Sequence, residues 1–434
     1  MSAPPRPAER CLCVPDVGVS RHLLFVSVAQ VVSSFAVSAL GLIRLCVRHV
    51  CGSYQEGAAM RALRLSAIVC GLTLACFGGA TGSAGATPSA TVTTVVSGLD
   101  NPRDLAFSPD GSLYVAEAGH GGNPADCIPG GPEGALCPGF TSGISVVNIA
   151  AGTSQRIVDG LASVSGEGGF AALGLHGISF LGNGTLYGII GLASDVVPGG
   201  AWSPELTAGL KAQLGRLIQA NPSGHWKTVA DVGHANFEWT EENQGLEPGD
   251  FPDSNPYAVL AAPGEQWVLD AGANTISRVR PNGTVSIEKF IPSDTLIGDA
   301  VPTCIDRGPD GALYIGQLTA ALNPPGSASI WRFDPATGAL TQWASGLTTV
   351  TGCGFGKDGQ FYAAEFSTLG LIAGAPGTGA VVRVPPHSTS PVVVVGGLSF
   401  PGGFAAGPDG SLYVSTWIVA PAATGLGSVV RITP

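Results

Sequence analysis

Residues 308–315 read GPDGALYI, residues 407–414 read GPDGSLYV, and residues 108–115 read SPDGSLYV. Each copy joins a tight turn to a short apolar strand, because Asp-Gly accepts the positive φ that a tight hairpin turn requires. A second short apolar strand precedes each turn, as in Asp104–Phe107. This sequence motif therefore predicts a chain built from repeated β-hairpins.

The repeats are spaced as the blades of a β-propeller. Weaker copies of the phrase at 182–187, 263–268 and 357–362 bring the number of repeats to six. Their marker aromatic residues are Tyr114, Tyr187, Trp267, Tyr314, Tyr362 and Tyr413, separated by 73, 80, 47, 48 and 51 residues. The last three separations match one propeller blade of about 40–50 residues. The first two indicate insertions, one around Cys127–Cys137 and one between Asp195 and Asp253, where Pro204–Ile218 is predicted to form a short helix.

The end of the chain indicates how the ring closes. The sixth repeat stops at its third strand, close to Pro434, whereas Thr91–Val96 is an apolar strand that precedes the first repeat. Pairing of this N-terminal strand with the C-terminal blade would remove the exposed sheet edges that favour aggregation. We therefore predict an all-β fold, a six-bladed β-propeller over residues 87–434.

The N-terminal residues are predicted to lie outside the propeller. Residues 60–86 have the basic start, apolar centre and small-residue end of a secretory signal peptide. Residues 1–59 are interpreted as a misannotated or non-structural extension. Two alternatives stay open, a membrane span at Leu23–Ile43 and lipidation at Cys76. The propeller itself is expected to be secreted or periplasmic.

Charge restricts the partners of the propeller. Residues 1–86 hold seven Arg against three acidic residues, a net charge of +4. Because the whole chain has a net charge of −11, residues 87–434 carry −15. Such an acidic body repels nucleic acid phosphates and anionic lipids. We expect no nucleic acid and no membrane as partner of the mature propeller. We expect instead a monomer that binds a small molecule, a glycan or a protein.

The sequence resembles a known propeller family. The resemblance is carried by Gly98-Leu99-x-x-Pro102, by SNPY at 254–257 and by DAGAN at 270–274. With the repeated PDG turns, these motifs resemble the ScyD/ScyE-like family of exported propellers, over roughly residues 92–434. More distantly the chain is similar to NHL-repeat and SMP-30/gluconolactonase propellers. The resemblance implies an exported six-bladed propeller and no particular reaction.

The cysteines are typical of an exported protein. Six of the ten lie in the first 86 residues, and none of the other four has the spacing of a zinc site. Cys127 and Cys137 bracket a Pro/Gly loop and are predicted to form a local disulfide. Cys304 and Cys353 occupy nearly equivalent inner positions of consecutive repeats, which suggests a disulfide between blades.

The loops at one end of the repeats supply the candidate site residues. Loops entering the inner strands and loops leaving the aromatic strands are expected to meet at the central channel. The candidates are Asn101, Arg103, Asp104, Glu117, His176, Asn255, Tyr257, Asp270, Asn274, Thr303, Gln317 and Glu365. Oxygen ligands suit calcium, for which we expect Glu117, Asn255 and Asp270 as the metal site.

Each of these residues also has a structural interpretation. Asp270 and Asn274 are residue types that brace turns, and Glu117 and Glu365 recur at equivalent repeat positions, which points to repeat geometry. There is no Gly-x-Ser-x-Gly elbow and no phosphate-binding glycine loop opening a helix. The sequence thus favours a binding or scaffold protein over an enzyme, with no cofactor except the suggested calcium. The alternative is a calcium-dependent hydrolase or lactonase of the SMP-30 type.

Overall fold

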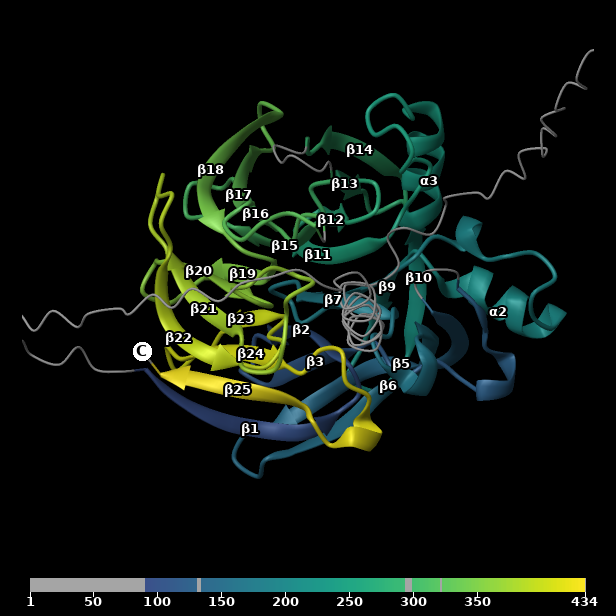
Figure 1. Ribbon diagram of the computed structural model, residues 1–434, viewed down its shortest axis with the longest axis horizontal. Helices are drawn as coiled ribbons and strands as arrows, with labels where there is room; N and C mark the ends of the chain where they lie inside the picture. The colour runs from purple at the N-terminus through teal and green to yellow at the C-terminus, as the bar shows by residue number, and fades with distance from the viewer. Residues whose placement is uncertain (1–89, 131–133, 293–298, 321, 434) are drawn as a thin grey trace, which may run out of the picture.

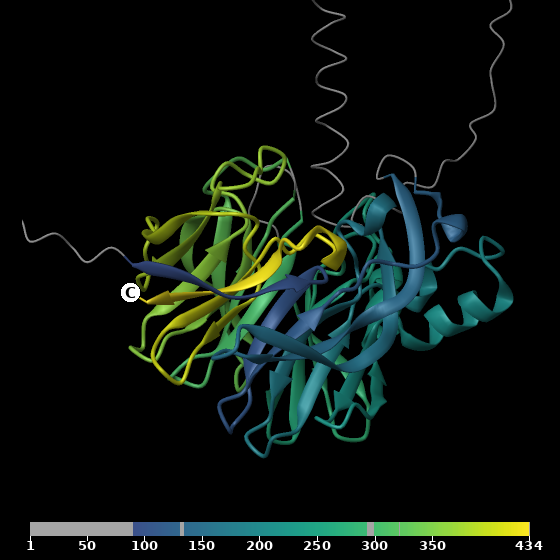
Figure 2. The same ribbon diagram turned by 90° about the horizontal axis from the view of Figure 1, so that it is seen from below.

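The computed structural model describes residues 90–130, 134–292, 299–320 and 322–433. Six antiparallel sheets surround a central axis, and each sheet forms one blade (Figure 1). Turned by 90°, the ring is seen from the side (Figure 2). The predicted six-bladed β-propeller is confirmed. The expected extension 1–59 and signal peptide 60–86 lie outside the described residues.

Each blade is named by its position in the chain, and its strands run outward from the axis. Blade 1 holds β2 (Pro102–Phe107), β3 (Leu113–Glu117), β5 (Ala135–Asn148) and β6 (Thr153–Ser165), with the short β4 (Ile128–Pro129) paired to β5. Blade 2 holds β7 (Leu175–Phe180), β8 (Leu186–Ile190), β9 (Arg216–Ala220) and β10 (Trp226–Asp231). Blade 3 holds β11 (Pro256–Ala262), β12 (Glu265–Asp270), β13 (Thr275–Val279) and β14 (Val285–Phe290).

The second half of the ring has the same order of strands. Blade 4 holds β15 (Pro302–Arg307), β16 (Leu313–Gln317), β17 (Ala328–Asp334) and β18 (Ala339–Leu347). Blade 5 holds β19 (Val350–Phe355), β20 (Phe361–Glu365), β21 (Gly379–Val384) and β22 (Val392–Leu398). Blade 6 holds β23 (Phe404–Ala406), β24 (Leu412–Thr416), β25 (Gly427–Thr433) and, as its outer strand, β1 (Thr91–Leu99).

Ring closure follows the prediction. β1 pairs antiparallel with β25, from Thr91 opposite Thr433 to Leu99 opposite Gly427. The purple N-terminal strand therefore lies beside the yellow C-terminal strand in Figure 1. This pairing gives blade 6 its fourth strand from the other end of the fold.

In the described part of the chain, a hydrophobic cluster lies between each pair of neighbouring blades. Leu175 and Ile144 belong to the cluster between blades 1 and 2, and Trp267 and Phe333 to that between blades 3 and 4. The other four clusters join blades 2 and 3, 4 and 5, 5 and 6, and 6 and 1. Because each blade buries both faces, the strands read as apolar runs, and the blades are held by packing around the whole ring.

The repeated PDG phrase explains the turns. Gly311 has φ +80° and Gly410 has φ +81°, values that residues with a side chain rarely adopt. The Asp before each glycine accepts the phenolic O–H of the marker tyrosine, as in Tyr314 to Asp310 at 3.2 Å. Arg332 donates to the same Asp310 carboxylate at 2.8 Å. In blades 4 and 6, the aromatic and basic residues of the repeat therefore bind the aspartate of the turn.

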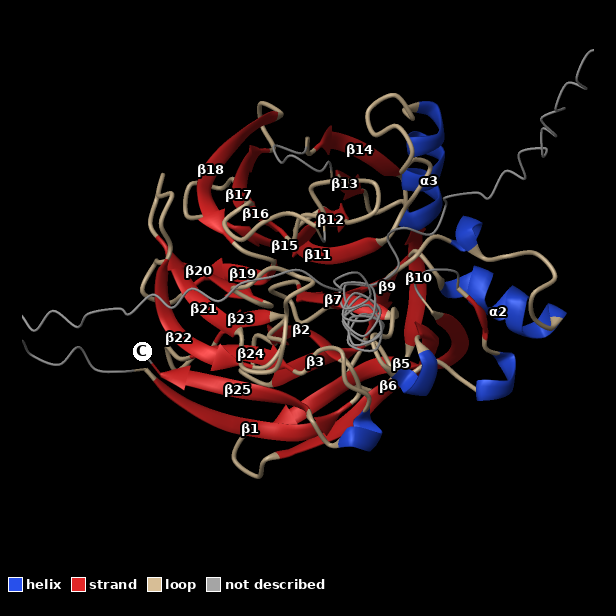
Figure 3. Ribbon diagram, in the orientation of Figure 1, coloured by secondary structure: helices blue, strands red, loops and turns tan. Residues whose placement is uncertain are grey.

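The helices α2 and α3 lie at the outer edge of the ring (Figure 3). α2 (Pro204–Gln213) begins after Ser203, whose Oγ accepts from the Leu206 N–H, with Pro204 in the first turn. It ends at Gln213 rather than at the predicted Ile218, because β9 starts at Arg216. α3 (Val232–Glu242) was not predicted. Four 3-10 turns, η1 (Pro124–Asp126), η3 (Glu167–Gly169), η4 (Ser194–Val196) and η5 (Ala422–Thr424), complete the connections.

Aromatic side chains attach the blade-two insertion to the ring. The ring of Trp239 packs against those of Phe251 and Phe290, with centroids 6.4 and 6.1 Å away. Trp202 donates its indole N–H to the Asp126 carbonyl at 2.8 Å and packs on the blade 1–2 core with Trp226. These aromatic residues contribute to the packing of the insertion.

Candidate functional site

A cavity of about 490 Å³ lies along the axis of the ring. The inner strand of every blade contributes to its wall: β2, β7, β11, β15, β19 and β23. Its volume is within the range of about 300–1,000 Å³ that is usual for small-molecule sites. The repeat thus converges six short strands on one ligand-sized space.

The exposure of the lining residues shows where the cavity opens. Pro109, Lys357 and Pro408 line one end, lie in the hairpin turns and are exposed. At the other end the lining residues Arg103 and His176 are 5% and 1% exposed. The cavity therefore opens on the face of the hairpin turns and deepens toward the loops that connect the blades.

An apolar cluster closes the loop end. It consists of Ala271, Val301, Leu318, Phe366, Leu371, Phe400 and Ile418. The rings of Phe366 and Phe400 stack with centroids 4.9 Å apart, and Ile418 also lines the cavity. The loops that were expected to form an open channel mouth thus meet in a packed plug, and the cavity is blind at this end.

The floor of the cavity combines a guanidinium with an uncharged imidazole. Arg103 donates from Nη2 to the Ala172 carbonyl at 2.6 Å. The His176 ring packs against that of Tyr257 with centroids 4.6 Å apart. Burial, and next to it the charge of Arg103, hold the pKa of His176 well below its usual range, although the Pro256 carbonyl acts the other way. His176 is therefore neutral at physiological pH.

Two aspartates face the middle of the cavity. Asp104, on β2, accepts the Leu105 N–H at 2.8 Å and the Ile178 N–H of the next blade at 3.1 Å. Its side chain contacts the cavity but lies deep in the protein, and this burial raises its pKa to about 7. Its protonation therefore changes near neutral pH.

Asp306, on β15, repeats this arrangement on the other side of the ring. It accepts the Arg307 N–H at 2.7 Å and the Phe355 N–H of the next blade at 2.8 Å. Burial raises its pKa as well. Both carboxylates thus bridge two blades and remain in contact with the cavity.

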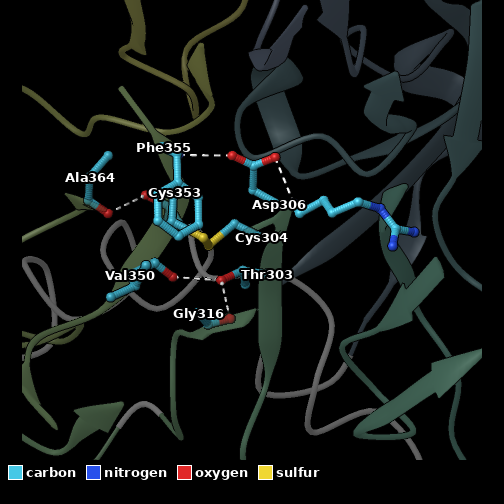
Figure 4. The surroundings of a disulfide bond; sticks show 10 residues. Thr303, Cys304, Asp306, Gly316, Val350, Cys353, Phe355 and Ala364 are labelled. Carbon is cyan, nitrogen blue, oxygen red and sulfur yellow. Dashed lines mark hydrogen bonds between the residues drawn. A yellow bond between two sulfur atoms is a disulfide. The ribbon is translucent and has the colours of Figure 1, made fainter. Parts of the chain in front are cut away.

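A disulfide is part of the cavity wall. Cys304 on β15 is bonded to Cys353 on β19, and both residues line the cavity. Figure 4 shows the bond beside Asp306 and Phe355. Gly316 leaves the space for it, since a Cβ there would lie 2.6 Å from the Cys304 sulfur. The predicted inter-blade disulfide and the local one, Cys127–Cys137, are both confirmed.

Five of the twelve candidate residues line this cavity: Arg103, Asp104, His176, Tyr257 and Thr303. Glu117 instead accepts the Asp100 N–H at 2.6 Å and the Ser145 hydroxyl, and lies 3.1 Å from the Arg156 guanidinium. Its carboxylate is thus already surrounded by donors.

Asp270 braces the loop that enters β11. Its Oδ1 accepts the N–H groups of Asn255, Gly272 and Ala273 at 2.7, 3.1 and 2.9 Å. Its Oδ2 accepts the Ser254 hydroxyl at 2.6 Å. Burial raises the pKa of Asp270 to about 6 in spite of these donors, so the group is ionised at pH 7.

Glu365 and Gln317 end the second strands of their blades, as Glu117 and Asp270 do. Glu365 accepts the Thr348 N–H at 2.8 Å, which corresponds to the bond from Asp100 to Glu117. The amide oxygen of Gln317 accepts the indole N–H of Trp331. A polar residue thus recurs at the end of the second strand in several blades, which agrees with its interpretation as part of the repeat geometry.

The three asparagines connect neighbouring loops. Asn101 has φ +48° and donates to the carbonyls of Gly119 and Gly169 at 2.7 and 2.9 Å. The amide oxygen of Asn255 accepts the Leu192 N–H at 2.9 Å. Asn274 has φ +53° and accepts the Val301 N–H at 2.7 Å. Each amide therefore ties one blade to the next.

The calcium site expected at Glu117, Asn255 and Asp270 stays a prediction. Glu117 lies on blade 1, whereas Asp270 ends β12 of blade 3 and directly binds the Asn255 N–H. Among the described residues, no group of three His, Cys, Asp or Glu side chains is placed to hold a metal ion.

Sequence reasoning missed Asp306. The equivalent position in the other blades holds Ala106, Ser179, Leu260, Gly354 and Ala405. Alignment of the six inner strands would have shown Asp306 as the one charged residue at a position occupied elsewhere by small or apolar residues. Asp104 was predicted only as a residue of an entering loop. Which end of the cavity is closed depends on how the loops pack, and the repeat sequence does not encode that packing.

Comparison with known proteins supplies no family assignment. No protein-family model matches the chain, and no curated protein is similar to it. Solved structures with similar folds include a gluconolactonase from Xanthomonas campestris, at 10% identity, covering 79% of this chain and 89% of that one, with a TM-score of 0.46. Virginiamycin B lyase from Staphylococcus aureus matches at 12% identity, 80% and 100% coverage and TM-score 0.41.

A protein of unknown function from Bacteroides thetaiotaomicron matches at 9% identity, with 80% and 76% coverage and a TM-score of 0.47. Such low similarity carries no argument about activity, and the fold rests on the six sheets themselves. The two disulfides fit an extracellular protein. Within the described ranges, no helix is long and apolar enough to cross a membrane.

Stability is expected to fall as the pH rises from about 5 to about 8. Burial raises the pKa of Asp104, Glu247, Asp253 and Glu365 to about 7. The folded state then holds protons that the unfolded chain releases between about pH 4 and pH 7. The carboxyls with lowered pKa, such as Asp310 and Asp409, titrate below this window. The lowered pKa of His176 acts in the opposite direction, as one group against the four carboxyls.

Urea unfolding at about pH 5 and about pH 8 should therefore give free energies that differ by more than about 1 kcal/mol, with the lower value at the higher pH. Glu365→Gln should reduce the difference, because it removes one of the groups that release a proton on unfolding. A free energy that rises over this interval would contradict the raised pKa values.

Proposed function

We propose that this chain is an exported binding propeller, of the type that the ScyD/ScyE resemblance implies, which takes a small molecule into its blind central cavity. The proposal is carried by the 490 Å³ cavity, which opens on the hairpin-turn face and ends at the buried Arg103 and His176. The two disulfides support export.

The walls are suited to selective binding. The partly exposed residues Phe107, Phe180, Leu260 and Phe355 belong to the lining of the cavity, and Asp104 and Asp306 add polar groups fixed by backbone hydrogen bonds. Polar groups held in fixed orientations beside apolar residues are a usual feature of small-molecule sites. Packing around the ring holds these groups in place without a bound partner.

A ligand screen followed by a cavity-filling variant tests this function. A library of neutral, cationic and anionic small molecules is screened by thermal shift against the purified protein, and hits are measured by titration calorimetry. Ala405→Trp places an indole at the cavity wall and should weaken binding at least roughly tenfold. Ala336→Trp, at an exposed turn of blade 4, should leave the affinity unchanged.

The two outcomes are distinct. Equal affinity in wild type and Ala405→Trp would place the ligand elsewhere and contradict the proposal. Recovering the ligand after incubation separates binding from turnover, because a hydrolase would return a lactone or ester as its acid. Recovery of the acid would support the competing prediction, a calcium-dependent hydrolase.

A further inference from the structure

The charged groups in the middle of the cavity are two carboxylates. The charged residues on its wall are Arg103, Asp104, Asp306 and Lys357. Lys357 lies in an exposed turn at the opening, and Arg103 is 5% exposed on the floor with its guanidinium bound to the Ala172 carbonyl. Asp104 and Asp306, in contrast, are partly exposed to the cavity between these two ends.

Both carboxylates keep the capacity to accept further hydrogen bonds. Each oxygen of Asp104 and of Asp306 accepts one backbone N–H. An ionised carboxylate offers about four lone-pair sites, so each group has room for other donors. No ion pair of either aspartate is present among the residues that the structure describes. The backbone therefore fixes their positions, and in the described ranges no basic side chain is paired with them.

The two groups face one space from opposite sides. Asp104 belongs to blade 1 and Asp306 to blade 4, and these blades are half a ring apart among six. The negative charge of Asp306 contributes to the raised pKa of Asp104, after the larger effect of burial. The carboxylates therefore interact with each other across the cavity, and a cation between them would relieve their repulsion.

We propose that the ligand of this cavity is an organic ammonium ion, with its charged nitrogen at Asp104 and Asp306 and its apolar part against the surrounding phenylalanine and leucine walls. This inference rests on the proposed binding function and adds the class of ligand. A primary ammonium has three N–H donors and matches the free lone pairs of the carboxylates.

Other ligand classes fit less well. Two carboxylates without a third protein ligand are few for a divalent metal ion, and no three His, Cys, Asp or Glu side chains in the described ranges are placed to bind one. An anion in the middle of the cavity would lie beside the carboxylates of Asp104 and Asp306, away from Lys357 at the opening and Arg103 on the floor. The propeller as a whole is acidic as well, which attracts cations to its surface.

Three probes of the same shape and different charge test the inference: benzylamine, benzyl alcohol and benzoate. Binding is followed by NMR, on the methyl groups of Leu105, Ile178 and Ile305, which line the cavity. At neutral pH, benzylamine is expected to bind at least roughly tenfold more tightly than the neutral and anionic probes, because a charge-assisted hydrogen bond forms only with the ammonium.

The aspartates are tested by Asp104→Asn and Asp306→Asn. Each retains the side-chain shape and should lower the affinity for benzylamine at least roughly tenfold, without a similar effect on benzyl alcohol. Asp159→Asn is the matched control, since Asp159 is exposed on β6 and the substitution changes the net charge equally. A loss of benzylamine affinity in the control alone would contradict the assignment.

The pH profile of the unsubstituted protein gives a test that needs no variant. Benzylamine affinity should rise as the pH increases through about 7, where Asp104 ionises. The other charged or titratable residues that line the cavity are Arg103, His176, Tyr257, Asp306 and Lys357, while Glu117 ends β3 and Arg307 ends β15. His176 is neutral throughout this range, so the rise is attributed to the aspartates.

The results separate the two proposals. Equal shifts with benzylamine and benzyl alcohol, or stronger binding of benzoate, would overturn the ammonium assignment while leaving the binding function intact. If no probe shifts the cavity methyls at millimolar concentration and the library screen also yields no cavity ligand, the binding function fails together with the assignment.

Discussion

Replacement of Cys304 and Cys353 by serine is expected to lower the free energy of unfolding by about 4 kcal/mol, from the chain entropy of the closed loop. The bond closes a segment of 49 residues and joins blades 4 and 5 at the cavity wall. The unfolded chain without it gains conformational freedom, and the buried core between these blades loses its covalent link. Equilibrium urea unfolding measures the difference.

The second disulfide supplies the matched control. Cys127 and Cys137 are separated by only 10 residues, so their replacement should cost about 3 kcal/mol by the same relation. The inter-blade variant should therefore unfold at the lower urea concentration. The opposite order, or no loss in the Cys304/Cys353 variant, would show that the bond does not stabilise the ring.

Asp270→Ala is expected to lower the free energy of unfolding by about 3–5 kcal/mol. Asp270 is fully buried and accepts one hydroxyl and three backbone N–H groups, which the alanine would leave without their acceptor. Buried donors that lose their partner cost roughly 1–3 kcal/mol each, partly recovered when the loop relaxes. The loss is measured by urea unfolding at neutral pH, where Asp270 is ionised.

Two further variants define the cause. Asp270→Asn keeps one acceptor oxygen and should fall between wild type and alanine, whereas Asp159→Ala on the exposed strand β6 should stay within about 0.5 kcal/mol. A loss in Asp270→Ala no larger than in Asp159→Ala would exclude the bracing role. Repeating the series with EDTA and with calcium tests the metal prediction, which requires a calcium-dependent rise that Asp270→Ala abolishes.

The fold was predictable because its determinants are local and repeated. The PDG turn, the marker tyrosine and the next strand lie within a few residues of one another, so each blade can be identified without knowing the others. The Cys304–Cys353 bond followed from the register of adjacent repeats. The closure of Thr91–Val96 onto β25 followed from the strand missing in the last repeat.

The site was less predictable because it depends on contacts between distant loops. Phe366, Phe400 and Ile418 come from blades 5 and 6 and close the end at which an open mouth was expected. Residues such as Glu117 and Asp270 have the chemistry of ligands, but their hydrogen bonds are satisfied by the chain itself. Which of two carboxylates faces a cavity is decided by strand direction and packing, and residue type alone does not reveal it.

Because β1 pairs with β25, the ring can close only after the last strand has been synthesised. Thr91 reaches its partner Thr433 only after every intervening blade has been synthesised, and Ser415 binds the Arg103 carbonyl across 312 residues. Such distant contacts are formed slowly, since their loop-closure entropy must be overcome first. During synthesis β1 therefore stays without its partner strand until β25 has been made.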